Sequence, residues 1–405
     1  MKASALFKLI CPTVLVMVDI LTLSAVAFFV FVAILVYIDR KNIEFKGVML
    51  LRRTKKGIEL IDSIAKSAPR FWNFIGLAAI PTAIIFMIAG VAMMLYISGT
   101  IISGQQQGPA MSLILPSLSS QQQTGLGGFV FFLPLWFWLI LITVLLVPHE
   151  VFHGIISRAV KVPLKSVGLM MFLIFPGAFV EPDENKLKKA KRIDRLKVFA
   201  SGAFANILTA AILFIFLTYI FQPIAIAEVG MKVYNITENS PAQLAGMQPN
   251  MTITQINGLR LDKNSRNPVG DAISKNNLQP GDEISISTLE GGTFLLTLGK
   301  NPQNASRPFI GITTTGPVIT KSNLMSVNSV LSVFNYMSLM IYFAVVIALV
   351  NLLPWKPFDG GLLFETLMEY VSKKHAPKIA NAATMFILAI FLFNFFGPTV
   401  IKLVS

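Results

Sequence analysis

A series of long apolar runs, each bounded by charged residues, constrains this chain most. A helix needs about 20 predominantly apolar residues to cross the hydrocarbon core of a bilayer. Six runs meet this requirement, at about residues 20–37, 74–97, 129–151, 198–221, 330–353 and 379–400. Hydrophobic residues make up 54% of the chain and charged residues only 13%, whereas a soluble domain has roughly 25% charged residues. This composition excludes an ordinary soluble enzyme. We therefore predict a polytopic α-helical membrane protein with about six transmembrane helices, the third continuing as a helix to Val160.

The N-terminus allows two interpretations. Residues 1–19 carry Lys2 and Lys8 before an apolar stretch, which is also typical of a cleaved signal peptide. The apolar run after Asp19 is long enough to span a membrane, so we expect a retained anchor.

The basic residues indicate how the chain is oriented. Residues 39–72 contain nine Lys and Arg and residues 158–197 contain ten, and loops of this kind face the cytoplasm. The connection 98–128 has no charge and two triple-Gln runs, so we expect a flexible external linker. Both termini and residues 222–325 are then also outside. The net charge of +14 reflects topology, and nucleic-acid binding is disfavoured because the basic residues do not share one soluble face. Whether the amphipathic segment Phe45–Phe71 lies on the membrane surface or gates a site is left open.

Residues 225–318 are predicted to form a β-rich domain between two membrane helices. Short β-like runs at 231–236, 252–256, 283–287 and 293–298 alternate with turn signals such as Asn257-Gly258. The strings Asn239-Ser240-Pro241-Ala242 and Ala245-Gly246-Met247 resemble a PDZ domain of membrane-associated proteases. By that resemblance, the loop Val229-Gly230-Met231 would bind a peptide carboxylate. The alternative is a structural β-domain without a ligand.

The chemistry is indicated by the string H-E-x-x-H at residues 149–153. On a helix, positions i and i+4 share a face, so His149 and His153 can bind one metal ion while Glu150 faces the water it holds. Zinc accepts such nitrogen ligands and keeps one position open in catalytic sites. The chain has three histidines and one cysteine, Cys11, which excludes a Cys-based zinc cluster. Because these polar residues follow an unbroken apolar run, we expect a site in a polar cavity within the membrane, toward the cytoplasmic face.

A third zinc ligand is expected from the string Asn351-Leu352-Leu353-Pro354-Trp355-Lys356-Pro357-Phe358-Asp359-Gly360-Gly361. It interrupts the cytoplasmic end of the fifth run, and its glycines allow the backbone to approach closely. Asp359 would then lie at the same depth as His149. His375 follows two lysines outside any span and is expected to be a solvated surface residue.

Together the two motifs resemble those of the site-2 protease family of intramembrane zinc metalloproteases. That family joins H-E-x-x-H on one helix to N-x-x-P-x-x-x-x-D-G on another, and the resemblance covers about residues 129–400. One departure is Phe358, where Leu is usual. The resemblance implies Zn2+ bound by His149, His153 and Asp359, Glu150 as general base, and Asn206 and Asn351 as support for the substrate or the oxyanion.

The resemblance also implies how such an enzyme works. Its substrate would be a transmembrane protein already cut by another protease, and the external PDZ-like domain would regulate access. The apolar segment 165–180, broken by Gly168, Pro176 and Gly177, could form a membrane-dipping hairpin whose edge pairs with substrate; simple burial is the alternative. The expected regions are an N-terminal membrane region (1–128), two parts of a catalytic core (129–224 and 319–405) and the inserted domain (225–318).

Two other functions remain open at this point. One is a membrane-surface zinc protease whose third ligand is a Glu on a later helix, for which Glu365 and Glu369 are available. The other is a non-catalytic membrane scaffold that presents its PDZ-like domain to partners.

Overall fold

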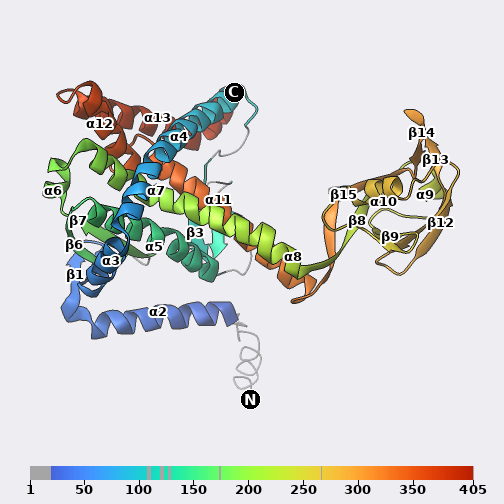
Figure 1. Cartoon of the computed structure of the whole chain (residues 1–405), viewed down its shortest axis with the longest axis horizontal. Coiled ribbons are helices and arrows are strands. Elements are labelled where there is room, and N and C mark those ends of the chain that lie inside the picture. Colours follow the sequence, from blue (N-terminus) through green and yellow to red (C-terminus); the bar gives the residue numbers. More distant parts are fainter. Residues whose placement is uncertain are drawn as a thin grey trace, which may run out of the picture. The chain divides into compact units, whose positions relative to one another are not determined.

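The computed structural model describes residues 20–106, 111–118, 123–125, 128, 130–172, 175–265 and 267–404, so the alternative signal peptide lies outside the described residues. The chain divides into two compact units, Met1–Ala211 with Met340–Ser405, and Ile212–Leu339. Figure 1 shows their elements along the sequence.

Five helices in the described residues are long and apolar enough to cross a membrane. They are α4 (Pro69–Ile102), α5 (Leu135–Ala159), the helix Arg192–Ala225 that begins as α7 (Arg192–Ile215) and continues through a π-helical segment (Phe216–Phe221) and α8 (Gln222–Ala225), α11 (Val327–Leu352), and α13 (Ala376–Val404). Their outer faces expose large apolar side chains such as Ile85, Ile88 and Met385, each at least 64% exposed. Such side chains suit contact with lipid, and the chain is a polytopic membrane protein.

The first expected span corresponds to α2 (Ile20–Ile38), whose apolar part, Thr22–Ile38, is shorter than the other five helices. Five of the six predicted spans thus coincide with span-length helices. A membrane span at residues 20–37 remains a prediction.

The third span begins later than the sequence predicts. Residues 130–134 form strand β5 (Val130–Pro134), and the helix starts at Leu135. A proline disfavours helical backbone angles in the residue that precedes it, here Leu133. Pro134 itself has the extended angles φ −51° and ψ 132°. The far end agrees with the prediction, because α5 ends at Ala159 with Val160 as its C-cap.

The connection expected to be a flexible linker contains ordered strands. β3 (Leu113–Ser117) pairs in parallel with β5, and β4 (Gln123–Gly125) pairs antiparallel with β5 on its other side. The apolar residues of β3 and β5 favour strands, and this pairing could not be read from the low charge and the Gln runs.

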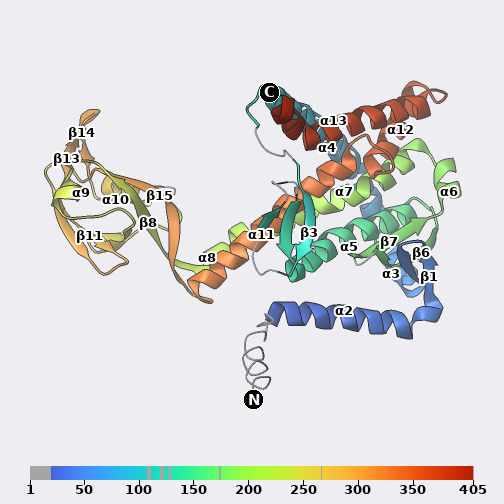
Figure 2. The same cartoon turned by 180° about the vertical axis from the view of Figure 1, so that it is seen from behind.

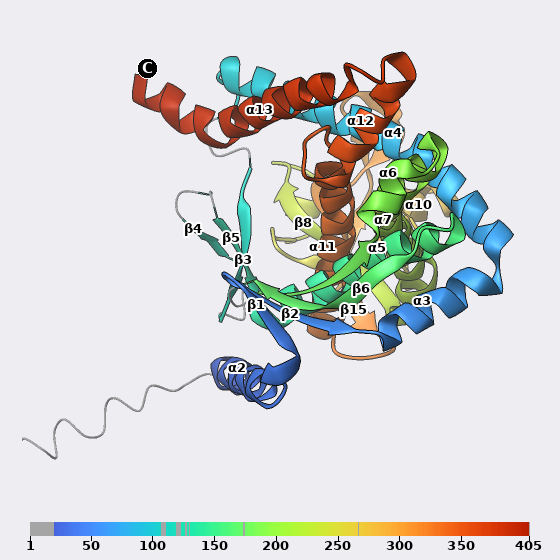
Figure 3. The same cartoon turned by 90° about the vertical axis from the view of Figure 1, so that its left-hand side faces the viewer.

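A four-stranded sheet in the order β1-β2-β6-β7 lies beside α5. Figure 3 shows β1, β2 and β6 of this sheet. Its strands are β1 (Ile43–Lys46), β2 (Met49–Thr54), β6 (Leu164–Phe172) and β7 (Phe175–Pro182). The hairpin expected at 165–180 is present as β6 and β7. β2 pairs with β6, so β7 is the edge strand on that side. Prolines at Pro176 and Pro182 suit an edge, since proline cannot donate to a neighbouring strand.

The amphipathic segment 45–71 folds against the protein. It contains β2, part of β1 and helix α3 (Lys56–Ser67), whose buried residues Ile61 and Ala65 pack with Ile155 of α5 and Leu164 of β6. A short 3₁₀ turn (Arg40–Asn42) leads from α2 into β1.

Small residues let the central helices approach closely. Ala79 and Ala83 of α4, Ala200 and Ala203 of α7, and Ala348 of α11 are at most 1% exposed and share one cluster. Close packing through small side chains is typical of membrane helices. Helix α12 (Asp359–Val371) follows α11 and contributes Leu363 to the same cluster. Helices α4 and α13 also lie side by side (Figures 1 and 2), joined by hydrogen bonds of the buried Asn394 to Ser98 and Met94.

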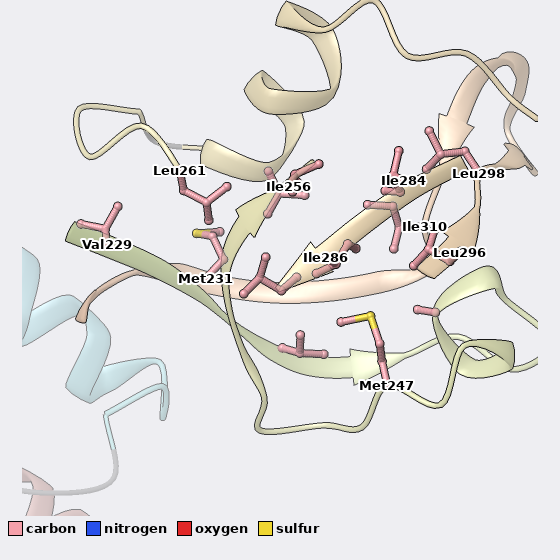
Figure 4. Packing of buried hydrophobic residues seen from close by; sticks show 14 of the residues in the cluster. Val229, Met231, Met247, Ile256, Leu261, Ile284, Ile286, Leu296, Leu298 and Ile310 are labelled. Atoms are coloured by element: carbon pink, nitrogen blue, oxygen red, sulfur yellow. The ribbon is translucent and has the colours of Figure 1, made fainter. Parts of the chain in front are cut away.

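The second unit contains a β-domain with its own apolar core, part of which Figure 4 shows. Its main sheet runs β12-β11-β9-β8-β15, with β10 paired to β9, and β13 and β14 form a separate pair. The elements are β8 (Ile226–Ile236), α9 (Pro241–Leu244), β9 (Thr252–Ile256), β10 (Leu259–Arg260), α10 (Pro268–Lys275), β11 (Glu283–Thr288), β12 (Thr293–Thr297), β13 (Gly299–Asn301), β14 (Asn304–Phe309) and β15 (Ile312–Ser322).

The predicted local signals of this domain are present. Three of the predicted runs lie within strands, and the run 293–298 matches β12 except for Leu298, which follows the strand. The Ser240 side chain caps α9 by accepting from the Gln243 N–H, with Pro241 in the first turn. Asn257 and Gly258 have positive φ, as the turn between β9 and β10 requires. The β-rich character is confirmed, whereas the PDZ assignment remains a prediction.

The prediction that Val229–Met231 form a peptide-binding loop is wrong. Val229, Gly230 and Met231 lie inside strand β8, where Gly230 pairs with Val318 and Met231 pairs with both Pro317 and Ile253. Val229 and Met231 are buried in the core (Figure 4). Burial of strand β8 in the apolar core of the domain, and not a loop, accounts for their apolar character.

Candidate metal centre and active site

The two histidines of the motif lie one helical turn apart on α5 and face the same point. His149 is 7% exposed and His153 is 9% exposed, and their Nε2 atoms are 3.2 Å apart. Asp359, the first residue of α12, places Oδ2 3.2 Å from His149 Nε2 and 3.0 Å from His153 Nε2. A tetrahedral zinc ion bound at about 2.0–2.1 Å separates its ligand atoms by about 3.3 Å. The three side chains therefore have the spacing of three corners of a zinc site.

The chain reaches this position through a tight turn between α11 and α12. A Cβ on Gly360 would collide with the backbone of Leu352 and Leu353, and a Cβ on Gly361 would collide with the backbone of Trp355. Glycine at both positions lets α12 begin directly against the end of α11. The turn thereby carries the Asp359 carboxylate to the histidines of α5.

Helix α7 leaves room for a bound ion. A Cβ on Gly202 would collide with the Nε2 atoms of both His149 and His153, so the glycine keeps the space beside the ligating nitrogens clear. A catalytic zinc site needs such space for its fourth position. Two imidazoles, a carboxylate and this free space fit zinc.

The histidines are also contacted on their far side by α7. His153 Nδ1 lies 2.8 Å from the Val198 carbonyl oxygen, to which it donates, and this leaves the Nε2 lone pair for a metal. The amide of Asn206 lies 3.3 Å from His149 Nδ1. Val198, Gly202 and Asn206 are four residues apart and share one face of α7. The sequence singled out Asn206 but not Gly202 and Val198, whose contacts with the histidines depend on how α5 and α7 pack.

Glu150 lies beside this cluster and is held by the hairpin. Its Oε2 accepts the Val180 N–H of β7 at 2.9 Å. Glu150 lines a cavity of about 470 Å³ together with His149, His153, Asp359 and Val180. The cavity continues toward charged side chains of α6 (Glu184–Lys189), α7 and α12, namely Glu184, Lys188, Arg195, Glu365 and Glu369. A carboxylate beside a metal-binding cluster in a cavity can accept a proton from water.

Comparison with known proteins agrees with this arrangement. The model of peptidase family M50 matches residues 137–395. The chain belongs to this family. An uncharacterized protein of Methanocaldococcus jannaschii is 26% identical over 349 residues, which cover 84% of each chain. A protein of Clostridium perfringens named "Putative zinc metalloprotease" is 25% identical over 237 residues, 49% of this chain and 69% of that protein.

Other predicted candidates in this M50 peptidase lie apart from the metal-binding group. Asn351 is half-buried near the end of α11 and is not among the described residues that line the cavity. His375 is exposed and hydrogen-bonded to Ser372. Glu365 pairs with Lys356 at 2.5 Å, and Glu369 pairs with Arg195 and Arg192. The roles of Asn206 and Asn351 toward substrate remain predictions.

A polar network secures the hairpin next to Glu150. Glu181, which follows Val180, accepts hydrogen bonds from Ser166 of β6 and from Arg53 of β2 at 2.6 Å each. The Ser166 hydroxyl, followed by the Arg53 guanidinium, lowers the pKa of Glu181 below its usual value. Strands β2, β6 and β7 are thus connected at the end of the hairpin nearest the site.

This network predicts a pH-dependent contribution to stability. Because the pKa of Glu181 is lowered in the folded state, its ionised form stabilises the fold above the ordinary pKa of 4.5, and this contribution is lost as the pH falls through the folded value. We expect Glu181→Gln to lower the midpoint of thermal unfolding at pH 7 and to have a smaller effect at about pH 3, relative to the unmodified protein at each pH.

The matched control is Glu44→Gln, since Glu44 binds the same Arg53 at 3.0 Å but has a side chain 51% exposed. Its effect should be smaller at pH 7. An equal loss from Glu181→Gln at both pH values would contradict the prediction.

Proposed function

We propose that this M50 peptidase is an intramembrane zinc metalloprotease that hydrolyses peptide bonds within or near transmembrane segments. One observation carries the proposal: His149, His153 and Asp359 converge beside Glu150 in a cavity, and the histidines lie on a helix apolar enough to span a membrane. Polar residues of this kind in a membrane helix generally have a function.

The residues have separate roles in the proposed reaction. Zinc bound by His149, His153 and Asp359 would supply Lewis acidity, which polarises a substrate carbonyl and makes water more acidic. Glu150 accepts the proton from the attacking water and later returns it to the leaving amine. The Val180 N–H holds one carboxylate oxygen of Glu150, which orients the base. Asn351 is proposed to support the developing oxyanion.

The substrate must reach this site in an extended form. The carbonyls of a transmembrane helix are occupied by hydrogen bonds within the helix, so we expect substrates with helix-breaking residues to be favoured. Strand β7 offers an edge beside the cavity, because β6 covers only its other side. We propose that an unwound substrate segment pairs with this edge.

The proposed orientation of the chain in the membrane follows from the distribution of its basic residues. The basic loops 39–72 and 158–197 would face the cytoplasm, with the active site toward that side and the domain 225–318 outside. That domain is proposed to be PDZ-like and to restrict access to substrates already cut by another protease, as in regulated intramembrane proteolysis.

The proposal predicts a metal-dependent activity. The purified full-length protein should contain about one zinc ion per chain, and dialysis against a chelator should abolish cleavage of a single-span reporter protein, with recovery on adding Zn2+. Metal content is measured by atomic spectroscopy and cleavage by gel electrophoresis. The control His375→Ala should keep its zinc, since His375 lies outside the metal-binding group. Folded protein without zinc, or cleavage that resists chelation, would refute the proposal.

A further inference from the structure

Both histidines of the metal-binding group have a second ring nitrogen, Nδ1, that faces away from the proposed metal. A neutral imidazole carries one proton, so an imidazole that binds metal through Nε2 has its proton on Nδ1. That proton requires a hydrogen-bond acceptor when it is buried. For His153 the acceptor is the Val198 carbonyl oxygen, 2.8 Å away.

The corresponding neighbour of His149 is the Asn206 side chain. Asn206 is 1% exposed, and its amide lies 3.3 Å from His149 Nδ1. In the geometry as it stands, the amide nitrogen faces Nδ1, and Asn206 Oδ1 is buried with no hydrogen-bond partner among the described residues. Two N–H donors would then oppose each other once Nδ1 is protonated.

Rotating the amide by 180° removes this conflict. The oxygen and nitrogen of an Asn amide have nearly the same shape, and the hydrogen-bond network decides between them. The rotation brings Oδ1 to the Nδ1–H of His149. We infer that Asn206 is a positioning residue that accepts this hydrogen bond and thereby holds His149 Nε2 toward the metal. This differs from the support for the substrate or the oxyanion that the family resemblance implied.

Three residues on one face of α7 contact the two histidines in a way that agrees with this role of Asn206. Val198 accepts from one histidine, Asn206 from the other, and Gly202 between them leaves the ligating nitrogens accessible. A partner on the far ring nitrogen fixes the tautomer and orientation of a metal-binding histidine. Helix α7 would therefore hold both imidazoles although it supplies no ligand itself.

The test measures zinc affinity, and it rests on the proposed zinc site. Zinc is competed from the full-length protein with a chromophoric chelator at constant pH. Asn206→Leu removes the acceptor at similar size and should weaken zinc binding by about 10–100-fold. Asn206→Asp keeps an acceptor oxygen and should stay within a few-fold of the unmodified protein in zinc affinity and in cleavage. The control is Asn394→Leu, another fully buried asparagine, which bonds Ser98 and Met94 away from the site and should not change zinc affinity.

The outcomes separate this inference from the proposed function. Unmodified protein that binds no zinc refutes the zinc site itself. If it binds zinc, unchanged affinity in Asn206→Leu overturns the inference alone, and so does weakened affinity in Asn206→Asp. Zinc affinity retained in Asn206→Asp with cleavage lost would assign Asn206 to the substrate, because an oxyanion needs a donor that aspartate lacks. If Asn206→Leu does not fold, Asn206→Ala replaces it; it also removes the acceptor and should weaken zinc binding in the same way, and unchanged affinity would overturn the inference.

Discussion

Glu150→Gln is expected to abolish cleavage of a single-span reporter while leaving zinc content unchanged. Glutamine cannot take a proton from water, and loss of a general base generally costs about 10²–10⁴-fold in rate. Its side-chain oxygen can still accept the Val180 N–H, which Glu150 binds at 2.9 Å. Glu150 is not part of the metal-binding group, so the affinity for zinc should persist. Single-turnover cleavage in proteoliposomes and metal analysis of the same preparation measure both effects.

The matched control for this variant is Glu184→Gln. Glu184 lines the same cavity, but its side chain is 74% exposed and pairs with Lys188. It should retain near-normal cleavage. Full activity in Glu150→Gln would contradict the assignment of Glu150 as the general base. Loss of zinc from this variant would show that Glu150 acts as a metal ligand instead.

Asp359→Ala is expected to remove both zinc and cleavage. Asp359 Oδ2 lies within 3.2 Å of both histidine Nε2 atoms, so its loss leaves two ligands where a catalytic zinc site generally has three. Zinc affinity, measured by competition with a chelator, should fall by at least about 100-fold, a larger effect than loss of a residue that only orients a ligand.

Glu365→Ala and Glu369→Ala distinguish this site from a protease with a glutamate ligand. Both carboxylates line the cavity, yet Glu365 pairs with Lys356 and Glu369 with Arg195. These variants should keep their zinc. Retention of zinc in Asp359→Ala together with its loss in Glu365→Ala or Glu369→Ala would favour the alternative class.

Much of the metal centre was predictable because it depends on local spacing. His149 and His153 share a helical face by their separation alone, and the Pro and Gly residues around Asp359 mark a break at the end of a span. The prediction that Asp359 lies near the histidines rested on their common depth in the membrane. Glu365 and Glu369 are outside the metal-binding group and pair with Lys356 and Arg195, and the order of residues does not indicate such pairings.

The fold was predictable where the hydropathy pattern is compatible with only one kind of secondary structure. An apolar run of about 20 residues can cross a bilayer only as a helix or in a closed barrel, and five of the six runs coincide with span-length helices. Short apolar segments are ambiguous. Residues 130–134 were predicted as the start of a helix and form strand β5. Val229–Met231, which the resemblance to a PDZ domain placed in a loop, lie inside β8.

By itself the sequence determined the membrane class, the H-E-x-x-H helix and the residues able to bind zinc, since these depend on hydropathy and on helical periodicity. Only the tertiary structure decided that the Val180 N–H holds Glu150, that Gly202 clears space beside both histidines, and that Asn206 lies against His149. These contacts join residues 30 to 57 positions apart. They depend on how α5, α7 and the hairpin pack, which no local pattern encodes.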